Sequence, residues 1–326
     1  MKFSVSTMYV IFFFMLTLDN FLLKWSLYEI SMIIMVMILN VTKGSSKMVS
    51  VVYYSVSSIT SIILLFTIVF CNNITLMSSF SSKLLFKFMM IMIFIKLSMF
   101  PFHNWMIYCY EKSSWNQIFL MSSIMKFIPI SFFCHFMLLW NNIIIFLIIN
   151  SIFMSFYVNI NFSLKKMLAC STSFNNFLLI YMFMLNIKQF ILFTIIYSII
   201  LYYLTYILSK FNCSKLFIIY NFKNIKYLFK MLIFIYSMLP MMMSFLLKWN
   251  FLYEMSKFNN YISFIYFMFL ISNLLMMWKY MVIIKNLMLM KKFFIFYKMN
   301  LKINISIFIL LIFFFFMFIM YNFLVD

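Results

Sequence analysis

Two lysines of this sequence stand inside apolar segments, where a charged side chain is unexpected. Lys96 lies between the runs KFMMIMIFI and LSMFPF, and Lys126 lies within QIFLMSSIMKFIPI. Glu29, in KWSLYEISMIIMVMI, is an acid in a comparable setting, and Lys248, in LPMMMSFLLKWNF, is a further lysine of this kind. Burial disfavours the charged form of lysine and a nearby carboxylate favours it, so such a set can take up and release protons. These residues indicate a proton relay.

A different role is open to any lysine near a helix end, because its long stem can lie along apolar surface while the ammonium reaches the lipid headgroups. This alternative applies most to Lys165 and Lys166, which open the run MLACSTSFNNFLLIYMF. A lysine held at the bilayer centre costs about 3 kcal/mol unless it is paired, hydrated or neutral. The position of each lysine along its helix therefore separates the two interpretations.

Two prolines accompany the buried lysines. Pro129 follows Lys126 by three residues, and Pro240 precedes Lys248 by eight. A proline removes a backbone hydrogen bond, which is tolerated at membrane depth where the freed carbonyl faces protein or a water-filled cavity. The pairing predicts helices interrupted at Pro129 and Pro240, with hydrated half-channels beside them. An ordinary packing kink is the alternative.

The histidines and cysteines give no metal pattern. His103, in MFPFHNW, is predicted to cap a helix end near the interface, with a relay role as the alternative, and His135 is interpreted as packed or interfacial. These histidines are too far apart for a metal site, and the cysteines show no CxxC spacing. We expect no metal, cofactor or cluster on this chain. The cysteines are Cys71, Cys109, Cys134, Cys170 and Cys213.

Composition places these residues in a membrane protein. The chain has 326 residues, 67% of them hydrophobic, with a mean hydropathy of +1.10, one glycine and three prolines. Such values lie outside the range of soluble globular chains. The apolar runs are about twenty residues long, which is enough to cross the hydrocarbon core as a helix. We predict an all-α polytopic membrane helix bundle, with a single transmembrane domain over residues 1–326.

The apolar runs predict about eleven transmembrane helices with mostly short connections. Lys2 precedes the first run without a small-residue cleavage site after it, so we expect a membrane helix there rather than a signal peptide. Two longer basic loops are predicted over residues 210–230 and 279–302. The predicted helices are 4–19, 26–42, 49–70, 84–102, 116–137, 139–158, 164–184, 188–209, 230–254, 258–278 and 303–324.

The charges read as topology signals. The net charge of +20 comes from 25 lysines, with no arginine, against five acids. Nucleic-acid recognition would need a polar folded domain and usually arginine forks, so nucleic acid is not an expected partner. Even numbers of predicted helices separate Lys47, Lys112 and the two basic loops, which places about seventeen lysines on one face and roughly five on the other. The N-terminus is predicted on the basic side and Asp326 on the opposite side.

The residue bias also describes the gene. The 48 phenylalanines, 35 methionines and 21 tyrosines, with abundant Ile, Asn and Lys, are typical of AT-rich codons. So many methionines suggest a code with two Met codons, which points to an animal mitochondrial genome. Such a bias also replaces glycine, so missing glycines count little against a family match.

One stretch carries a family resemblance. FIKLSMFPFHNWMIYCYEKSSWNQIFLMSSIMKFIPI resembles the core signature of NADH:ubiquinone oxidoreductase chain 2, an antiporter-like subunit family of respiratory complex I. That family has a KLxxxPFHxW helix end, then SW near the next helix start, then a lysine closely followed by an interrupted helix. The matching residues are Lys96, Pro101, Phe102, His103, Trp105, Ser114, Trp115, Lys126 and Pro129.

Three further stretches agree in order. WSLYEISMI resembles the family segment that carries its membrane glutamate, which falls on Glu29. LKKMLACSTS resembles a basic pair followed by LAYSSI and puts the family's relay lysine on Lys165 or Lys166. LPMMMSFLLKW resembles LPPxxGFxPKW and puts the distal lysine on Lys248. Together the matches span roughly residues 25 to 250.

The sequence also departs from the family pattern. Cys170 replaces a tyrosine, Asn175 a histidine and Phe177 a glycine. In the last motif Met241, Ser244 and Leu247 replace Pro, Gly and Pro, although the motif's first proline and its lysine remain. The short N-terminal region is similar to the animal chain, which resembles a fourteen-helix antiporter fold without its first three helices.

The resemblance implies a proton-translocating membrane-arm subunit in the mitochondrial inner membrane, with the N-terminus on the matrix side and the C-terminus on the intermembrane-space side. NADH, FMN, iron–sulfur clusters and ubiquinone are expected in other subunits. The implied partners are other membrane-arm subunits, including sibling antiporter-like chains, and lipids. In this scheme Glu29 pairs with Lys126, Lys96 lies beside them, and Lys165 or Lys166 and Lys248 pass protons onward.

Two other functions use the same residues. A stand-alone cation/proton antiporter would need the buried lysines and the broken helices but no partner subunits. A structural membrane-arm subunit would use the buried charges only to fix helix packing.

Overall fold

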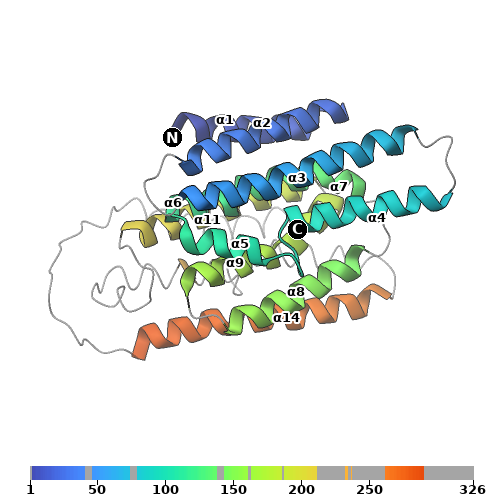
Figure 1. The fold of residues 1–326 in the computed structure, drawn as a ribbon. Coiled ribbons are helices and arrows are strands. Elements are labelled where there is room, and N and C mark those ends of the chain that lie inside the picture. The colour runs from blue at the N-terminus through green and yellow to red at the C-terminus, as the bar shows by residue number, and fades with distance from the viewer. Residues whose placement is uncertain are drawn as a thin grey trace.

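The computed structural model describes residues 2–40, 46–73, 79–137, 143–160, 163–185, 187–210, 232–233, 236 and 261–289. Within these ranges the regular structure is helical, and the helices lie side by side in a bundle (Figure 1). The helices are α1 (Lys2–Thr17), α2 (Phe21–Asn40), α3 (Ser46–Asn73), α4 (Ser79–Lys96), α5 (Asn104–Lys112), α6 (Trp115–Ser122), α7 (Ile124–Met137), α8 (Ile143–Ile160), α9 (Leu164–Phe174), α10 (Asn176–Leu185), α11 (Ile187–Lys210) and α14 (Tyr261–Leu289).

Apolar composition and length explain why these segments are helices. In hydrocarbon every backbone N–H and C=O must be satisfied within the segment, which a helix does along its whole length. Nine of the predicted helices are found within the described ranges, some of them as two pieces. The predicted helices 230–254, apart from Leu232, Ile233 and Tyr236, and 303–324 lie outside the described residues. Among the described residues, the spans long and apolar enough to cross a membrane are Phe21–Asn40, Lys47–Thr67, Trp115–Cys134, Ile143–Ile160, Leu164–Met184, Ile187–Ser209 and Phe267–Lys285.

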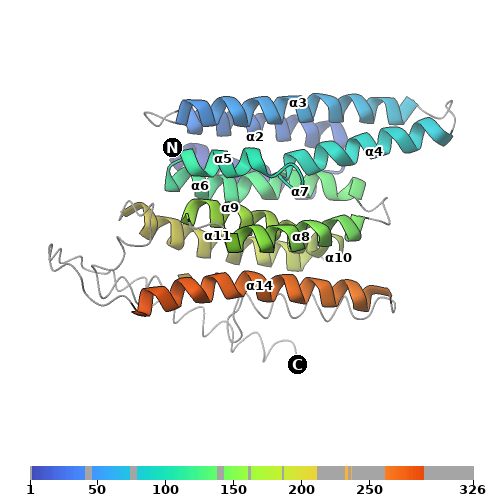
Figure 2. The same ribbon diagram turned by 60° about the horizontal axis from the view of Figure 1, so that its bottom comes forward.

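Within the described ranges, three passes consist of two helices joined end to end (Figure 2). Residues 97–103 separate α4 from α5, Ser123 separates α6 from α7, and Asn175 separates α9 from α10. The sequence predicted a continuous helix over residues 84–102 and no helix over α5. Both predictions were wrong. The helix ends at Lys96, and the apolar residues that continue after Lys96 give no sign of this end.

The interruption predicted at Pro129 is also displaced. Helix α7 runs through Pro129 from Ile124 to Met137, and the interruption lies at Ser123, six residues earlier. Ser123 has φ −107° and ψ −96°, and its hydroxyl donates to the Phe119 carbonyl at 2.7 Å. A serine hydroxyl that bonds the preceding turn competes with the helical ladder. The helix thus continues through Pro129 although the proline cannot donate a backbone hydrogen bond. The helical conformation is interrupted at Ser123 instead.

Helix α14 extends further than predicted. The sequence placed the end of this helix at residue 278 and a basic loop over 279–302, but α14 continues to Leu289. Lys279 donates to the Asn159 carbonyl at 2.7 Å and so links α14 to the end of α8. The lysines therefore did not mark the end of the helix.

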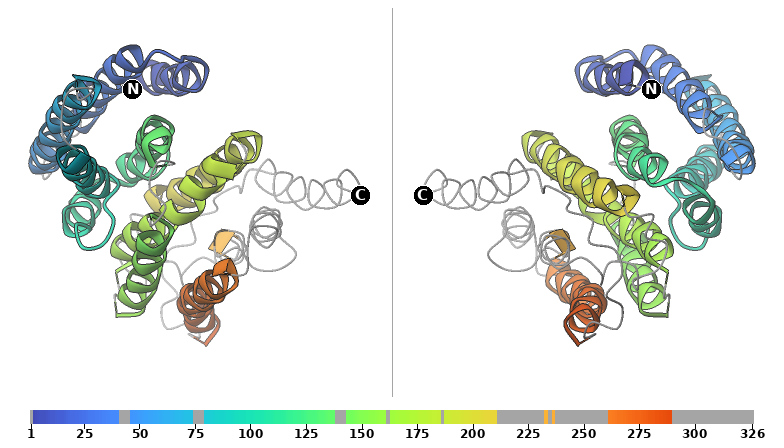
Figure 3. Two further views of the ribbon diagram at one scale, coloured as in Figure 1. Left: turned by 90° about the vertical axis from the view of Figure 1, so that its right-hand side faces the viewer. Right: turned by 90° about the vertical axis from the view of Figure 1, so that its left-hand side faces the viewer.

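The most deeply buried passes are α6/α7 and α9/α10. In the spans Trp115–Cys134 and Leu164–Met184, 94% of the residues are buried, against 39–56% in the other spans that the described ranges contain. Viewed along the bundle, the N-terminal helices form an arc on one side and α14 lies on the other (Figure 3). The two central passes carry Lys126 and the α9–α10 junction, so the bundle places its buried polar residues away from lipid.

Candidate functional site

Lys126 lies at the middle depth of the bundle. It stands eleven residues after Trp115 and eight before Cys134 in a pass of twenty residues, which puts it roughly 16 Å along the helix. Its side chain is 3% exposed, and its Nζ donates to Asn176 Oδ1 at 3.3 Å. Within this chain the ammonium stays inside the bundle and does not extend to its ends.

Asn176 connects Lys126 to the break after α4. Its Oδ1 accepts from Lys126, and its Nδ2 donates to the carbonyl of Leu97 at 2.7 Å. Leu97 directly follows Lys96, the last residue of α4. Asn176 is fully buried and lies twelve residues after Leu164 and eight before Met184, again near the middle of a pass. One amide thus bridges the two lysine regions.

The end of α4 has the hydrogen bonds of a Schellman motif. The N–H of Ser98 donates to Ile95 at 3.1 Å and the N–H of Met99 donates to Phe94 at 2.9 Å. Ser98 has a φ of 53°, the left-handed conformation that the motif requires and that glycine usually supplies. The chain thereby leaves the helix directly after Lys96.

Side chains from other helices satisfy the backbone that the break exposes. Asn150, at mid-length in α8, accepts from the N–H of Phe100 at 2.8 Å and donates to the Ser173 carbonyl at 3.0 Å. Trp105 Nε1, from α5, donates to the Ile95 carbonyl at 3.0 Å. The Phe100–Pro101 peptide is cis. Non-helical backbone is tolerated at membrane depth where the protein supplies such partners.

Lys96 lies between α2 and α3 and has aromatic and sulfur partners. Its Nζ is 2.7 Å from the Met32 sulfur and 5.0 and 5.3 Å from the ring centres of Tyr28 and Tyr53. The side chain is 6% exposed. An ammonium over two aromatic faces gains electrostatic stabilisation without a bound carboxylate. The sequence did not predict these partners.

Glu29 lies on the Lys96 side of the site. It follows Tyr28, whose ring centre lies 5.0 Å from the Lys96 ammonium, and among the described residues its Oε1 is buried without a hydrogen-bond partner. The sequence predicted that Glu29 would pair with Lys126, whereas the structure gives Lys126 the Asn176 amide. The difference arises because helix packing, which sequence spacing does not encode, sets which buried groups meet.

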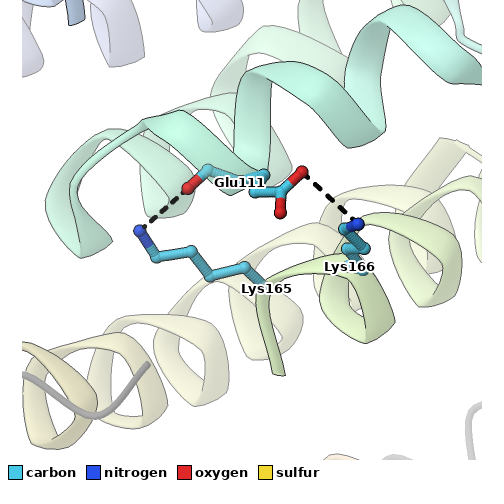
Figure 4. Close-up of polar contacts among 3 residues, drawn as sticks. All are labelled: Glu111, Lys165 and Lys166. Atoms are coloured by element: carbon cyan, nitrogen blue, oxygen red, sulfur yellow. Dashed lines mark hydrogen bonds and ion pairs between the residues drawn. The ribbon is translucent and has the colours of Figure 1, made fainter. Parts of the chain in front are cut away.

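Lys165 and Lys166 lie at one end of the bundle, at the start of α9 (Figure 4). Lys165 Nζ donates to the carbonyls of Ser113 at 2.6 Å and Glu111 at 3.3 Å. Lys166 Nζ forms an ion pair with Glu111 Oε2 at 3.4 Å, with side chains 34% and 47% exposed. Both lysines hold the end of α5 against α9. This geometry favours the helix-end interpretation that the sequence left open for the pair.

His103 immediately precedes α5, in the N-cap position, but its side chain makes no capping hydrogen bond. Its ring packs against Phe100 and edge-on against Tyr157 of α8, and its Nδ1 is buried without a hydrogen-bond partner. The sequence predicted that His103 caps a helix end near the interface. Instead, His103 lies at the junction between α4 and α5, within a split pass. Lys248 and Pro240 lie outside the described residues.

The residues missed by sequence reasoning are neutral and polar. Asn150, Asn176, Ser171 and Thr172 supply partners at mid-depth, and none of them carries a charge that would mark it in an apolar run. The available signal was an asparagine in the middle of an apolar helix, where an amide must find hydrogen-bond partners. Among the described residues, no group of three His, Cys, Asp or Glu is placed to hold a metal ion.

Buried lysines at mid-depth, beside helices that break there, characterise this chain as a polytopic membrane protein with ionisable groups inside its helix bundle. The sequence is 41% identical over 248 residues to NADH-ubiquinone oxidoreductase chain 2 of Apis mellifera ligustica, covering 75% of this chain and 73% of the relative. The chain belongs to the NADH-ubiquinone oxidoreductase chain 2 family. No model of a protein family matches the sequence.

Solved structures share the fold at low sequence identity. A chain of respiratory complex I from Thermus thermophilus with bound aureothin aligns with a TM-score of 0.74 at 11% identity, over 94% of this chain and 75% of that chain. A chain of the membrane-bound sulfane sulfur reductase, an archaeal respiratory membrane complex, aligns at 0.72 and 11%, over 91% and 68%. A chain of the Mrp complex from Dietzia sp. DQ12-45-1b aligns at 0.65 and 12%, over 79% and 55%. The fold is therefore that of antiporter-like subunits.

Proposed function

We propose that this chain carries protons across the mitochondrial inner membrane as a membrane-arm subunit of complex I, with Lys126, Lys96 and Glu29 as relay residues. The observation that supports the proposal most is the position of Lys126. Its ammonium is 3% exposed at the middle of a pass and has a neutral amide as its hydrogen-bond partner. Among the described residues, Lys126 forms no ion pair with a carboxylate, so its charge depends on the surrounding protein.

The relay works through coupled charges. Glu29 follows Tyr28, whose ring centre lies 5.0 Å from the Lys96 ammonium, and Asn176 joins the Leu97 carbonyl to the Lys126 ammonium. When the Glu29–Lys96 interaction strengthens, the local positive potential at Lys126 changes and shifts its protonation, since charges interact strongly where the effective dielectric is low. Lys248 takes the proton onward in this scheme. His103, half-buried just before α5 and packed against Phe100 and Tyr157, is a candidate for the exit from Lys96.

The rest of the proposal is supported by family membership. Redox chemistry occurs in other subunits, which hold NADH, FMN, iron–sulfur clusters and ubiquinone, and sibling antiporter-like chains flank this one. The described helix order places the start of α3, the end of α5 and the start of α9 at one end of the bundle (Figure 1). Those ends carry Lys47, Lys112, Lys165 and Lys166, so the positive-inside rule assigns that end to the matrix.

The test is Lys126→Met in the intact complex, reconstituted in liposomes. We expect assembly and NADH oxidation to be retained and the number of protons pumped per NADH to fall, because methionine fills the site without a titratable group. The control is Lys47→Met, which removes an exposed lysine at the start of α3. If the assembled Lys126→Met complex pumped with the ratio of the Lys47→Met complex, the chain would be a structural subunit.

A further inference from the structure

The Lys96 side chain ends between two tyrosine rings and a methionine sulfur from neighbouring helices. Tyr28 and Met32 lie four residues apart on one face of α2, and Tyr53 lies on α3. The Lys96 ammonium is 5.0 Å from the ring centre of Tyr28 and 5.3 Å from that of Tyr53, which is the range in which a cation is attracted to an aromatic face. We call Tyr28, Met32 and Tyr53 the aromatic cage.

Side chains from two further helices hold the rings of the aromatic cage in place. The Tyr28 ring stacks on Phe132 of α7 at 5.6 Å, with the ring planes 6° apart. The Tyr53 ring packs against Trp105 of α5 at 6.3 Å, and the Tyr53 hydroxyl donates to the Met32 sulfur at 3.7 Å. Both tyrosines are buried. Because α5 and α7 fix the orientation of the rings, the cage is preorganised around the cation.

The aromatic cage occupies the place where a carboxylate would be expected. Among the described residues, Lys96 forms no ion pair with an acid. Its Nζ donates to the Met32 sulfur, but a thioether is a weak acceptor, so the ring faces supply most of the attraction. A ring face attracts an ammonium through its charge, and the attraction increases when water is excluded. The cage therefore favours the charged form of Lys96 over the neutral amine.

We propose that Tyr28 and Tyr53 are positioning residues of the proton relay, whose ring faces hold the charged form of Lys96 at the break after α4. This inference rests on the proposed function for the role of Lys96, whereas the cage itself rests on the ring contacts alone. The tyrosines act through the negative faces of their rings, which phenylalanine shares and leucine lacks. A ring at each position is therefore required, and the Tyr28 hydroxyl is not.

The first test is the position of Lys96 in a map of the assembled complex. We expect its Nζ to lie within about 6 Å of both ring centres, since a cation at that distance is still attracted to the ring face. An ammonium that instead forms an ion pair with Glu29, or with a carboxylate of a neighbouring subunit, overturns the proposal. This readout needs no variant and does not depend on pumping.

The second test places Tyr28→Phe and Tyr28→Leu in the intact complex, each with wild-type Lys96 and with Lys96→Met. Among the described residues the Tyr28 hydroxyl has no hydrogen-bond partner, so we expect Tyr28→Phe to melt near the wild type and Tyr28→Leu to melt lower. With Lys96→Met no cation lies over the ring, so the difference between phenylalanine and leucine should become much smaller. A difference of equal size in both backgrounds reflects ring packing alone and overturns the cage. If Tyr28→Leu does not assemble, the map alone decides.

The third test is the number of protons pumped per NADH by assembled variants in liposomes. We expect Tyr28→Phe to pump like the wild type. Tyr28→Leu and Tyr53→Leu should pump fewer protons, because Lys96 loses the ring faces that hold its charge. The control is Tyr54→Leu, which removes a 55% exposed ring at the neighbouring position of α3. Leucine variants that pump like this control overturn the positioning role.

The cage and the proposed relay fail in different ways. If Lys126→Met lowers the number of protons pumped while Tyr28→Leu and Tyr53→Leu pump normally, the relay stands and the positioning role is rejected. If Lys126→Met pumps normally, the relay is rejected together with the positioning role. The map and the melting comparison then still decide whether the two rings hold the Lys96 ammonium.

Discussion

Lys126 and Lys166 show two ways in which this chain holds a lysine. Lys166, at the start of α9, forms an ion pair with Glu111 in which both side chains reach solvent, at 34% and 47% exposure. Lys126, at mid-depth in α7, is 3% exposed, and within the described part of the chain its hydrogen-bond partner is an asparagine amide. Glu111 therefore pairs with Lys166, which water already stabilises. Lys126, which is buried and would gain more from a counter-charge, has a neutral partner instead.

This difference separates lysines that stay charged from lysines whose charge can change. A surface ion pair remains charged at neutral pH and contributes little free energy. The charge of a buried lysine with a neutral partner depends on its surroundings. A proton relay needs this property, whereas a lysine that only holds two helices together does not. Three substitutions extend this comparison, in order of decreasing expected effect on stability.

The largest effect is expected for Asn176→Leu. Leucine removes the donor to the Leu97 carbonyl and the acceptor for Lys126, so two buried polar groups lose their partner. At about 1–3 kcal/mol for each group, the purified complex should melt several degrees lower, or the subunit should fail to assemble. The measurement is thermal unfolding of the complex, with the exposed Asn104→Leu as control. Equal melting of the two variants would show that the bridge does not hold the central passes together.

An intermediate effect is expected for Lys165→Met. This change removes hydrogen bonds to the carbonyls of Ser113 and Glu111 at the end of α5, where the lysine is half-buried. The expected cost is about 1 kcal/mol, measured as a lower melting temperature, with an unchanged number of protons pumped per NADH. Lys165→Arg keeps the donors and should melt near the wild type. A loss of pumping in assembled Lys165→Met would make this residue a relay member and remove the contrast with Lys126.

The smallest effect is expected for Glu111→Gln. It removes the charge that pairs with Lys166 but keeps the side-chain length, and the pair is partly exposed. We expect a change of about 0–1 kcal/mol in unfolding free energy, which shrinks further at high salt because exposed charges are screened. The measurement is thermal unfolding of the complex at low and high ionic strength. A destabilisation larger than that of Asn176→Leu would reverse the order proposed for the two regions.

The sequence located the charged members of the site because apolar runs make a charge conspicuous. Lys96, Lys126 and Glu29 were found in this way, and the first two are buried in the structure. The pairing between them could not be predicted, because Lys126 and Asn176 are fifty residues apart and Leu97 and Asn176 are seventy-nine apart. Helix packing brings these groups together, and no local sequence pattern predicts which helices pack against each other.

Helix interruptions were the least predictable feature. Proline was used as their marker, yet α7 continues through Pro129, while α4 ends at Lys96, two residues before Ser98, which has the left-handed conformation. In a chain with one glycine, the usual residue for that conformation gives no signal. The breaks persist because Asn150, Asn176 and Trp105 supply the hydrogen bonds that the helix loses.

The amino-acid sequence by itself determined that this protein is a bundle of membrane helices with lysines at mid-depth, since span length and burial of charge depend on short, local patterns. The tertiary structure alone decided which groups those lysines contact: Met32, Tyr28 and Tyr53 for Lys96, and Asn176 for Lys126. The physical reason is that hydrogen bonds and ring contacts act over a few ångströms, and only the packing of distant segments brings their partners within that range.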